Sequence, residues 1–162
     1  MRSRNFFYLP KLFALLLAAP LLVGGVNAAV PPSQAPQLTT LLSSFKGKVV
    51  LLDFWASWCE PCRQSFPWMN DLQKRYGAEN FVVVAVNLDQ NRKLADQFLA
   101  ATPAAFRVEY DPQGALATQY DVISMPMSFV LDRSGKVRQR HIGFRDAQRA
   151  TREQEIATLL KE

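Results

Sequence analysis

The sequence is poor in residues that bind metal ions, with two cysteines and one histidine among 162 residues. A structural zinc site takes four ligands, and Cys59, Cys62 and His141 supply only three, so we expect no metal site. Two cysteines also exclude a small fold held by several disulfides. What remains to be explained is the stretch WASWCEPCRQSFP (residues 55–67), in which two residues separate the two thiols.

Long apolar runs are also missing, apart from one near the start. Residues 12–26 (LFALLLAAPLLVGGV) are apolar, but this run is shorter than the roughly 20 residues of a membrane-spanning helix. Basic residues precede it, and small residues in Val26-Asn27-Ala28 follow it at the two positions that a signal peptidase recognises. We predict a signal peptide over residues 1–28, cleaved near Ala28, and an exported, periplasmic protein. The alternative is an uncleaved membrane anchor.

No strong charge bias remains beyond this segment. The chain has 19 basic and 14 acidic residues, and without Arg2, Arg4 and Lys11 the excess falls from +5 to +2 (16 against 14). A nucleic-acid-binding domain would be far more basic, so we expect no nucleic-acid partner. We predict a flexible leader over residues 29–37 and one domain over 38–162, long enough for a single core and monomeric.

Apolar runs of strand length alternate with helix-like segments across this domain. Val49–Trp55 and Phe81–Leu88 are almost unbroken apolar runs, as in strands covered on both faces. We expect further strands at 106–110, 127–131 and 137–142, and helices at 38–45, 61–76, 92–101, 115–120 and from a cap at Asp146 to 160. The order predicts an α/β fold with a central mixed sheet flanked by helices.

The two cysteines lie where a buried strand gives way to a helix. Free N–H groups and the dipole at a helix N-terminus stabilise an anion, and so a thiolate at Cys59. We predict that Cys59 is the nucleophile and that Cys62, one turn further on and less exposed, resolves the mixed disulfide. Pro61 fits the first helical turn, where its missing N–H costs nothing. A structural disulfide is the alternative, although a bridge across so short a loop stabilises least.

LLDFWASWCEPCR (residues 51–63) resembles the active site of the thioredoxin superfamily. From about residue 41 to residue 160 the chain is similar to the exported TlpA/ResA-like thiol-disulfide oxidoreductases, in GKVVLLDFWASWC, the CxxC pair, Pro67 and SMPMSFVLDRSGK. The resemblance implies a thioredoxin fold with an inserted helix–strand segment, which residues 92–110 would supply. It also implies a cis-proline at Pro126, with Met125 offering backbone groups to an extended client.

Asp53 is the most informative residue outside the cysteine pair. Burial within VVLLDFWA would raise the pKa of its carboxyl group. In thioredoxins an aspartate at this offset lies beneath the resolving cysteine and is proposed to shuttle its proton, so the resemblance implies that role here. Many TlpA-like sequences have asparagine instead, and the lysine that thioredoxins place nearby is replaced by Ala85. The alternative is a solvated carboxylate at the sheet edge.

Other residues near the pair have weaker signals. A negative charge at Glu60 opposes a thiolate at Cys59 and favours a reductant, unless Glu60 is only a solvent-facing spacer. We expect Trp58 to shield the disulfide and contact clients, and Trp55 to pack in the core. We expect His141 to be a structural histidine.

These features predict a thiol-disulfide oxidoreductase that exchanges its redox-active disulfide with client protein cysteines and acts as a reductase. No bound cofactor is needed, because the electrons reside in the cysteines. The resemblance implies apocytochrome c or metal-site cysteines as clients, and a membrane thiol-transfer protein as electron donor. The alternatives are a thiol oxidase or isomerase using the same site, a copper-binding chaperone using Cys59, Cys62 and His141, and a binding module whose disulfide is incidental.

Overall fold

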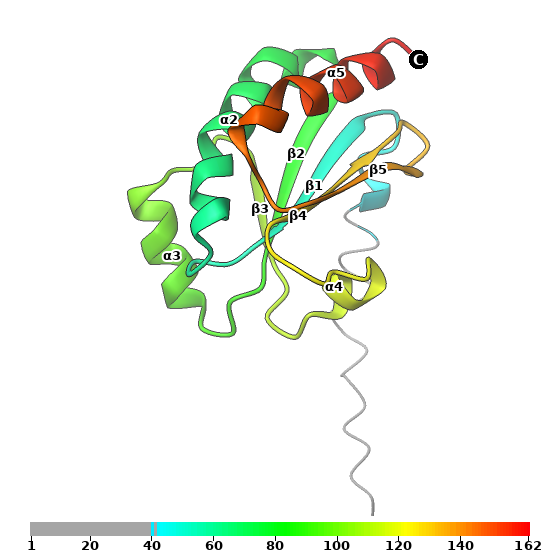
Figure 1. Cartoon of the computed structure of the whole chain (residues 1–162). Helices are drawn as coiled ribbons and strands as arrows, with labels where there is room; N and C mark the ends of the chain where they lie inside the picture. Colours follow the sequence, from blue (N-terminus) through cyan, green and yellow to red (C-terminus); the bar gives the residue numbers. More distant parts are fainter. Residues whose placement is uncertain (1–39, 41) are drawn as a thin grey trace, which may run out of the picture.

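The computed structural model describes residues 40 and 42–162 (Figure 1). The predicted signal peptide and leader lie outside the described residues. The strands are β1 (Val49–Trp55), β2 (Phe81–Asn87), β3 (Arg107–Tyr110), β4 (Met127–Leu131) and β5 (Val137–Ile142). The helices are α2 (Glu60–Tyr76), α3 (Arg92–Ala101), α4 (Ala115–Gln119) and α5 (Arg149–Leu160), with 3₁₀ turns η1 (Gly77–Glu79) and η2 (Asp146–Gln148).

The strands form one mixed sheet in the order β3-β2-β1-β4-β5. β1 is parallel to β2, which is parallel to β3, whereas β4 is antiparallel to both β1 and β5. The predicted α/β architecture is confirmed, and α3 and β3 form the expected inserted segment, with β3 as an edge strand. β1 is the central strand, so the residues at its carboxyl end are flanked by β2 on one side and β4 on the other.

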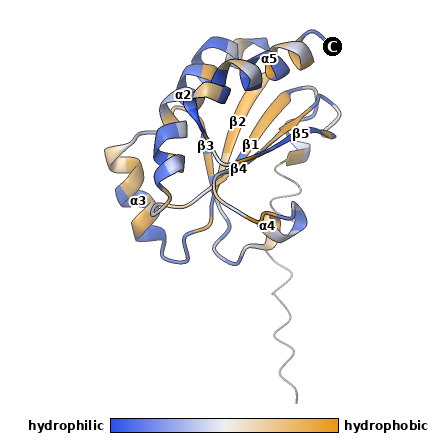
Figure 2. Cartoon of the chain, viewed as in Figure 1, coloured by the Kyte–Doolittle hydropathy of each residue, from blue (hydrophilic) through white to orange (hydrophobic). Residues whose placement is uncertain are grey.

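Each face of the sheet has its own hydrophobic cluster because side chains alternate along a strand. Val49, Leu51 and Trp55 of β1 pack with residues of α2, α3 and α5 on one face. The alternate residues of β1 pack with Leu116 of α4 on the other. Helices α2 and α5 lie side by side on the first face, where Arg75 pairs with Glu153 (Figure 1). Buried β1 and β2 are apolar, whereas exposed β5 is mostly hydrophilic (Figure 2).

The predicted start of the last helix is wrong. Asp146 does not cap the last helix, because residues 146–148 form the separate 3₁₀ turn η2 and α5 begins only at Arg149. The residue that precedes α5 is Gln148, whose side chain makes no capping hydrogen bond. The Asp146 carboxylate instead pairs with Arg149 at 2.8 Å. The helix predicted over 38–45 ends earlier, because residues 40, 42 and 43 are helical and a turn begins at residue 44. The remaining boundaries differ by at most one residue, as at α2, which starts at Glu60.

Among residues 40 and 42–162, no helix combines the length and the apolar character needed to cross a membrane.

Candidate active site

A disulfide joins Cys59 and Cys62 at the start of α2. Cys59 is the N-cap residue, and its Sγ accepts a hydrogen bond of 3.3 Å from the backbone N–H of Cys62. Pro61 lies in the first turn, as predicted. The structure therefore confirms that the pair lies at a helix N-terminus, where N–H groups face the Cys59 sulfur and would stabilise it as a thiolate once the bond is reduced.

The two sulfurs differ in accessibility. Cys62 is fully buried, whereas Cys59 retains 4% of its surface. Cys62 packs in the hydrophobic cluster with Trp55 and Phe66, whose rings meet edge-on at 4.9 Å. Cys59 is therefore the more exposed of the two cysteines, which matches the expected order of exposure.

The loop before the disulfide is fixed by Asp89, a residue to which the sequence analysis assigned no role. The Asp89 carboxylate accepts hydrogen bonds from the backbone N–H of Ser57 at 2.8 Å, from the Ser57 hydroxyl at 2.9 Å and from the Asn87 side chain at 2.7 Å. Asp89 is 5% exposed. It joins the end of β2 to the loop at the end of β1, and so sets where residues 57–59 begin the active-site turn. The Asn-x-Asp pattern that begins at the last residue of β2 marks Asp89 as a candidate polar group, but it does not indicate that Ser57 is its partner.

We expect Asp89→Ala to lower the free energy of unfolding of the oxidised protein by about 2–3 kcal/mol, because it leaves buried donors unpaired. Urea unfolding followed by tryptophan fluorescence measures this change. The control is Asp71→Ala, which removes an exposed carboxylate paired with Arg75 and should cost no more than about 0.5 kcal/mol. Equal losses in the two variants would contradict the anchoring role of Asp89.

The loop before β4 packs against the hydrophobic cluster that contains both cysteines. The Met125–Pro126 peptide bond is cis, as the resemblance implies. Pro126 is buried and its carbonyl accepts the N–H of Gly143 at 2.8 Å. Met125 is partly buried against the cluster that contains both cysteines. Trp58, in the loop before Cys59, is 70% exposed, and Ile123, in the loop before β4, is 68% exposed. These two exposed apolar side chains belong to the two loops that flank the disulfide.

Asp53 is buried in β1, with 3% of its surface exposed and no hydrogen-bond partner at Oδ2. Burial raises the pKa of Asp53 from 3.8 to about 8, and the positive charge of Arg152 opposes part of that rise. The predicted direction is confirmed, and the alternative of a solvated carboxylate at the sheet edge is wrong because β1 is the central strand. Asp53 shares the face of β1 on which Trp55 and α2, including Cys62, pack.

Glu60 is an exposed residue and His141 is a partly buried one. Glu60 is 70% exposed and pairs with Arg63 at 3.5 Å, which partly neutralises the charge that it brings to Cys59. His141 is half-buried, and its Nε2 lies 2.7 Å from Glu155 Oε2. Within residues 40 and 42–162, no three histidine, cysteine or acidic side chains are grouped to hold a metal ion. Cys59, Cys62 and His141 therefore do not form such a group.

Comparison with known proteins agrees with this geometry. The sequence profile of the Redoxin family matches residues 26–160. The chain belongs to the Redoxin family. Within that family it is a TlpA/ResA-like member of the thioredoxin superfamily.

The curated relatives align with this chain over only part of their own length. The thiol-disulfide oxidoreductase ResA of Oceanobacillus iheyensis is 34% identical over 106 residues, covering 65% of this chain and 55% of ResA. The thioredoxin-like protein YneN of Bacillus subtilis is 41% identical over 105 residues, covering 63% of this chain and 61% of YneN. The chain thus matches a little over half of each of these curated relatives.

Solved structures confirm the thioredoxin fold. A Chlorobium tepidum protein, provisionally assigned as the thiol:disulfide interchange protein DsbE, is 55% identical with a TM-score of 0.73, covering 74% of this chain and 84% of that one. StoA from Bacillus subtilis is 30% identical with a TM-score of 0.58, covering 66% of this chain and 82% of that one.

Proposed function

We propose that this Redoxin-family protein is an exported thiol-disulfide oxidoreductase that exchanges its Cys59–Cys62 disulfide with cysteines of client proteins. The observation that supports this most is the asymmetry of the disulfide. Cys59 is the N-cap of α2 and retains a small exposed fraction (4%), while Cys62 is fully buried in the core. A purely structural disulfide would not require one of its cysteines to lie at a helix N-terminus, where a thiolate is stabilised.

Reduction of a client then proceeds in two balanced steps. The Cys59 thiolate attacks a client disulfide, forming a Cys59–client disulfide and releasing one client thiolate. Cys62 loses its proton to the Asp53 carboxylate, attacks the Cys59 sulfur and releases the second client thiolate. Two electrons pass from the dithiol to the client, and the Cys59–Cys62 disulfide forms. In the reverse direction a client thiolate attacks Cys59, and protonated Asp53 returns the proton to Cys62 as it leaves.

The client site is built from the two loops beside the disulfide. Trp58 offers an exposed aromatic surface, and the backbone of Met125, held by the cis peptide to Pro126, offers strand-like hydrogen bonds to an extended client chain. Glu60 and Pro61 adjust the stability of the Cys59 thiolate from the first turn of α2.

Within this function we propose the reductase direction. The negative charge of Glu60 beside Cys59 disfavours its thiolate, and a less stabilised thiolate makes a weaker oxidant. A reductase in an oxidising compartment must have its disulfide reduced again after each turnover. We propose a membrane thiol-transfer protein as the electron donor. Relatives named thiol-disulfide oxidoreductase support exchange with protein thiols, and the proposed clients are apocytochrome c or metal-site cysteines. The copper-chaperone alternative has no support from the position of His141, which pairs with Glu155.

The direction is tested by the reduction potential of the Cys59–Cys62 pair. The purified protein is equilibrated against glutathione or dithiothreitol, with tryptophan fluorescence as the readout. We expect a value near or below about −220 mV, in the range of the reducing members of this fold. A value near −120 mV would instead make the protein an oxidant of thiols. An insulin-reduction assay then separates an enzyme from a binding module, because only the enzyme reduces insulin catalytically.

A further inference from the structure

The carboxylate of Asp53 lies in a row of side chains that crosses the sheet. In register, Asp53 pairs with Ala85 of β2 on one side and with Ser128 of β4 on the other, and Ser128 pairs with His141 of β5. Residues opposite one another in neighbouring strands share a face, and helices α2 and α5 cover this face. Neither Ala85 nor Ser128 brings a charge to Asp53, so any countercharge has to come from beyond its strand neighbours.

Arg152 of α5 is the buried cation on this face. It is only 4% exposed, and its Nη2 donates to the Gly143 carbonyl at 2.9 Å and to the Gln148 side chain at 3.0 Å. Both acceptors are neutral, and within residues 40 and 42–162 Arg152 has no ion pair. Burial of a guanidinium is costly without a negative charge nearby. Its two tethers fix the cation at the helix that packs over β1, and the negative charges that act on it are those of Asp53 and Glu155.

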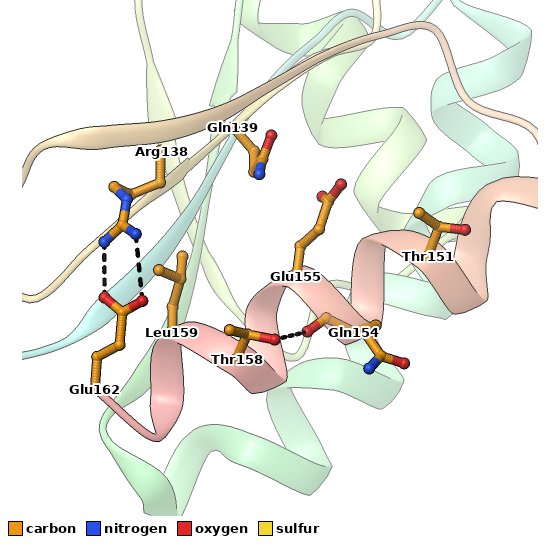
Figure 3. Close-up of a pocket in the computed structure, with 8 residues that line it drawn as sticks. All are labelled: Arg138, Gln139, Thr151, Gln154, Glu155, Thr158, Leu159 and Glu162. Atoms are coloured by element: carbon orange, nitrogen blue, oxygen red, sulfur yellow. Dashed lines mark hydrogen bonds and ion pairs between the residues drawn. The ribbon is translucent and has the colours of Figure 1, made fainter.

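The other titratable groups that face Asp53 do not supply its countercharge, and Glu155, the second anion that acts on Arg152, is better exposed to solvent. From α2 the facing group is Cys62, which is uncharged in the disulfide. From β5 it is His141, whose pKa is lowered, mainly by burial, so this ring is neutral where Asp53 titrates. Glu155 of α5 is negative, but it projects into the groove between α5 and β5 (Figure 3) and is partly exposed there. Solvent therefore screens Glu155 more than it screens Arg152.

We propose that Arg152 is the counter-cation of Asp53, a positioning residue that keeps the buried carboxylate able to exchange a proton with Cys62. The inference rests on the proposed function in taking that proton exchange as the purpose of Asp53. The competing explanation is that Arg152 only anchors α5 to the turn at Gly143. The sequence gives no hint of the pairing, because 99 positions separate the two residues (152 − 53).

A counter-cation would help proton transfer by bringing the pKa of the Asp53 carboxyl group close to that of the Cys62 thiol. A thiol ordinarily titrates near 8.5, and proton transfer is easiest between groups of similar acidity. With Arg152 in place the pKa of Asp53 is about 8, close to that of a thiol. Without the cation, burial alone would raise the pKa of Asp53 further. The carboxyl group would then be ionised, and able to accept the proton of Cys62, in a smaller fraction of the molecules at a given pH.

The test is a titration of the Asp53 carboxyl carbon by NMR in the oxidised protein, labelled with ¹³C-aspartate and assigned with Asp53→Asn. In Arg152→Gln we expect the midpoint to rise by about one unit or more, the effect of removing an opposite charge. Arg152→Lys keeps the charge and should leave the midpoint near that of the wild type. An unchanged midpoint in Arg152→Gln, or a rise in Arg152→Lys as large as that in Arg152→Gln, would overturn the proposal in favour of a simple anchor.

The chain offers a matched control in Arg149, three residues earlier on α5. The guanidinium carbons of Arg149 and Arg152 lie 5.5 Å and 5.7 Å from the centre of the Phe144 ring, but Arg149 pairs with Asp146. Arg149→Gln should therefore alter packing on Phe144 in a similar way and leave the Asp53 midpoint unchanged. A similar rise in Arg149→Gln would show that loss of packing, and not loss of charge, moves the midpoint.

A second readout separates this proposal from the proposed function. The rate at which Cys62 resolves a mixed disulfide is measured against pH in wild type and in Arg152→Gln. If the NMR midpoint and the pH profile both move upward, the pairing and the proton transfer are both supported. If the midpoint moves and the profile does not, Arg152 is still the counter-cation and the proton role of Asp53 fails. If the midpoint does not move, the pairing itself fails whatever the protein reduces.

Discussion

Cys59→Ser should abolish catalytic reduction of insulin, lowering the rate by roughly three orders of magnitude or more, because a serine hydroxyl is not ionised near neutral pH. Cys59 is the more exposed cysteine, and its sulfur accepts the backbone N–H of Cys62 at the start of α2. The loss should appear in the rate constant and not in folding, since the short bridge contributes little to stability. The initial rate of insulin reduction at fixed dithiothreitol measures it.

Cys62→Ser is the matched control, because it removes the same bridge and leaves the nucleophile. This variant should still attack a client once but should not release it, so mixed disulfides accumulate and are visible on non-reducing gels. Cys59→Ser should trap none, since Cys62 is fully buried. If the two variants trapped clients equally, the assignment of nucleophile and resolving residue would be wrong. If both retained full insulin reduction, the disulfide would be incidental.

The elements that could be predicted from the sequence are those set by apolar patterning. Four elements have the predicted bounds, namely β1 (Val49–Trp55), α3 (Arg92–Ala101), β4 (Met127–Leu131) and β5 (Val137–Ile142). For β1 the reason is simple, since a strand buried on both faces is apolar throughout. The start of α5 could not be predicted in this way. An aspartate before a helical segment fits a cap and a 3₁₀ turn equally well, and the structure shows the turn at residues 146–148.

The residues of the candidate site also fall into two groups, those that local sequence indicates and those that depend on the tertiary fold. Cys59 and Cys62 lie within one short contiguous motif, and local sequence was enough to place them at a helix start. The cis peptide before Pro126 was implied by the family resemblance of SMPMSFVLDRSGK. Asp89 and Arg152 act across the fold, Asp89 on Ser57 from 32 positions away and Arg152 on the face of Asp53 from the last helix. Such contacts depend on which elements become neighbours. That is decided by the sheet order and helix packing, and no local pattern records it.

Asp53→Asn should stabilise the oxidised protein at neutral pH, by an amount on the order of 4 kcal/mol at pH 7. The pKa of Asp53 is raised from its usual 3.8 to about 8 by burial. Well below pH 3.8 the Asp53 carboxyl group is protonated in both the folded and the unfolded chain, so its ionisation does not lower the free energy of unfolding. Between pH 3.8 and about 8 only the unfolded chain ionises, so the free energy of unfolding falls as pH rises through this window. Asparagine cannot ionise and avoids the loss.

The pH dependence distinguishes this effect from a general gain in packing. Urea unfolding at several pH values should show wild type and Asp53→Asn nearly equal near pH 3.5, and diverging up to about pH 8. Asp132→Asn is the control of opposite sign, because hydrogen bonds from Ser134 and other donors lower the pKa of Asp132. That variant should lose stability at neutral pH, with the loss disappearing on acidification. A gain in Asp53→Asn that did not change with pH would show that the buried carboxyl group is already ionised or is solvated. A gain that grows with pH would instead mean that the protein keeps at β1 an acid that weakens its own fold, as expected of a group retained for proton transfer to Cys62.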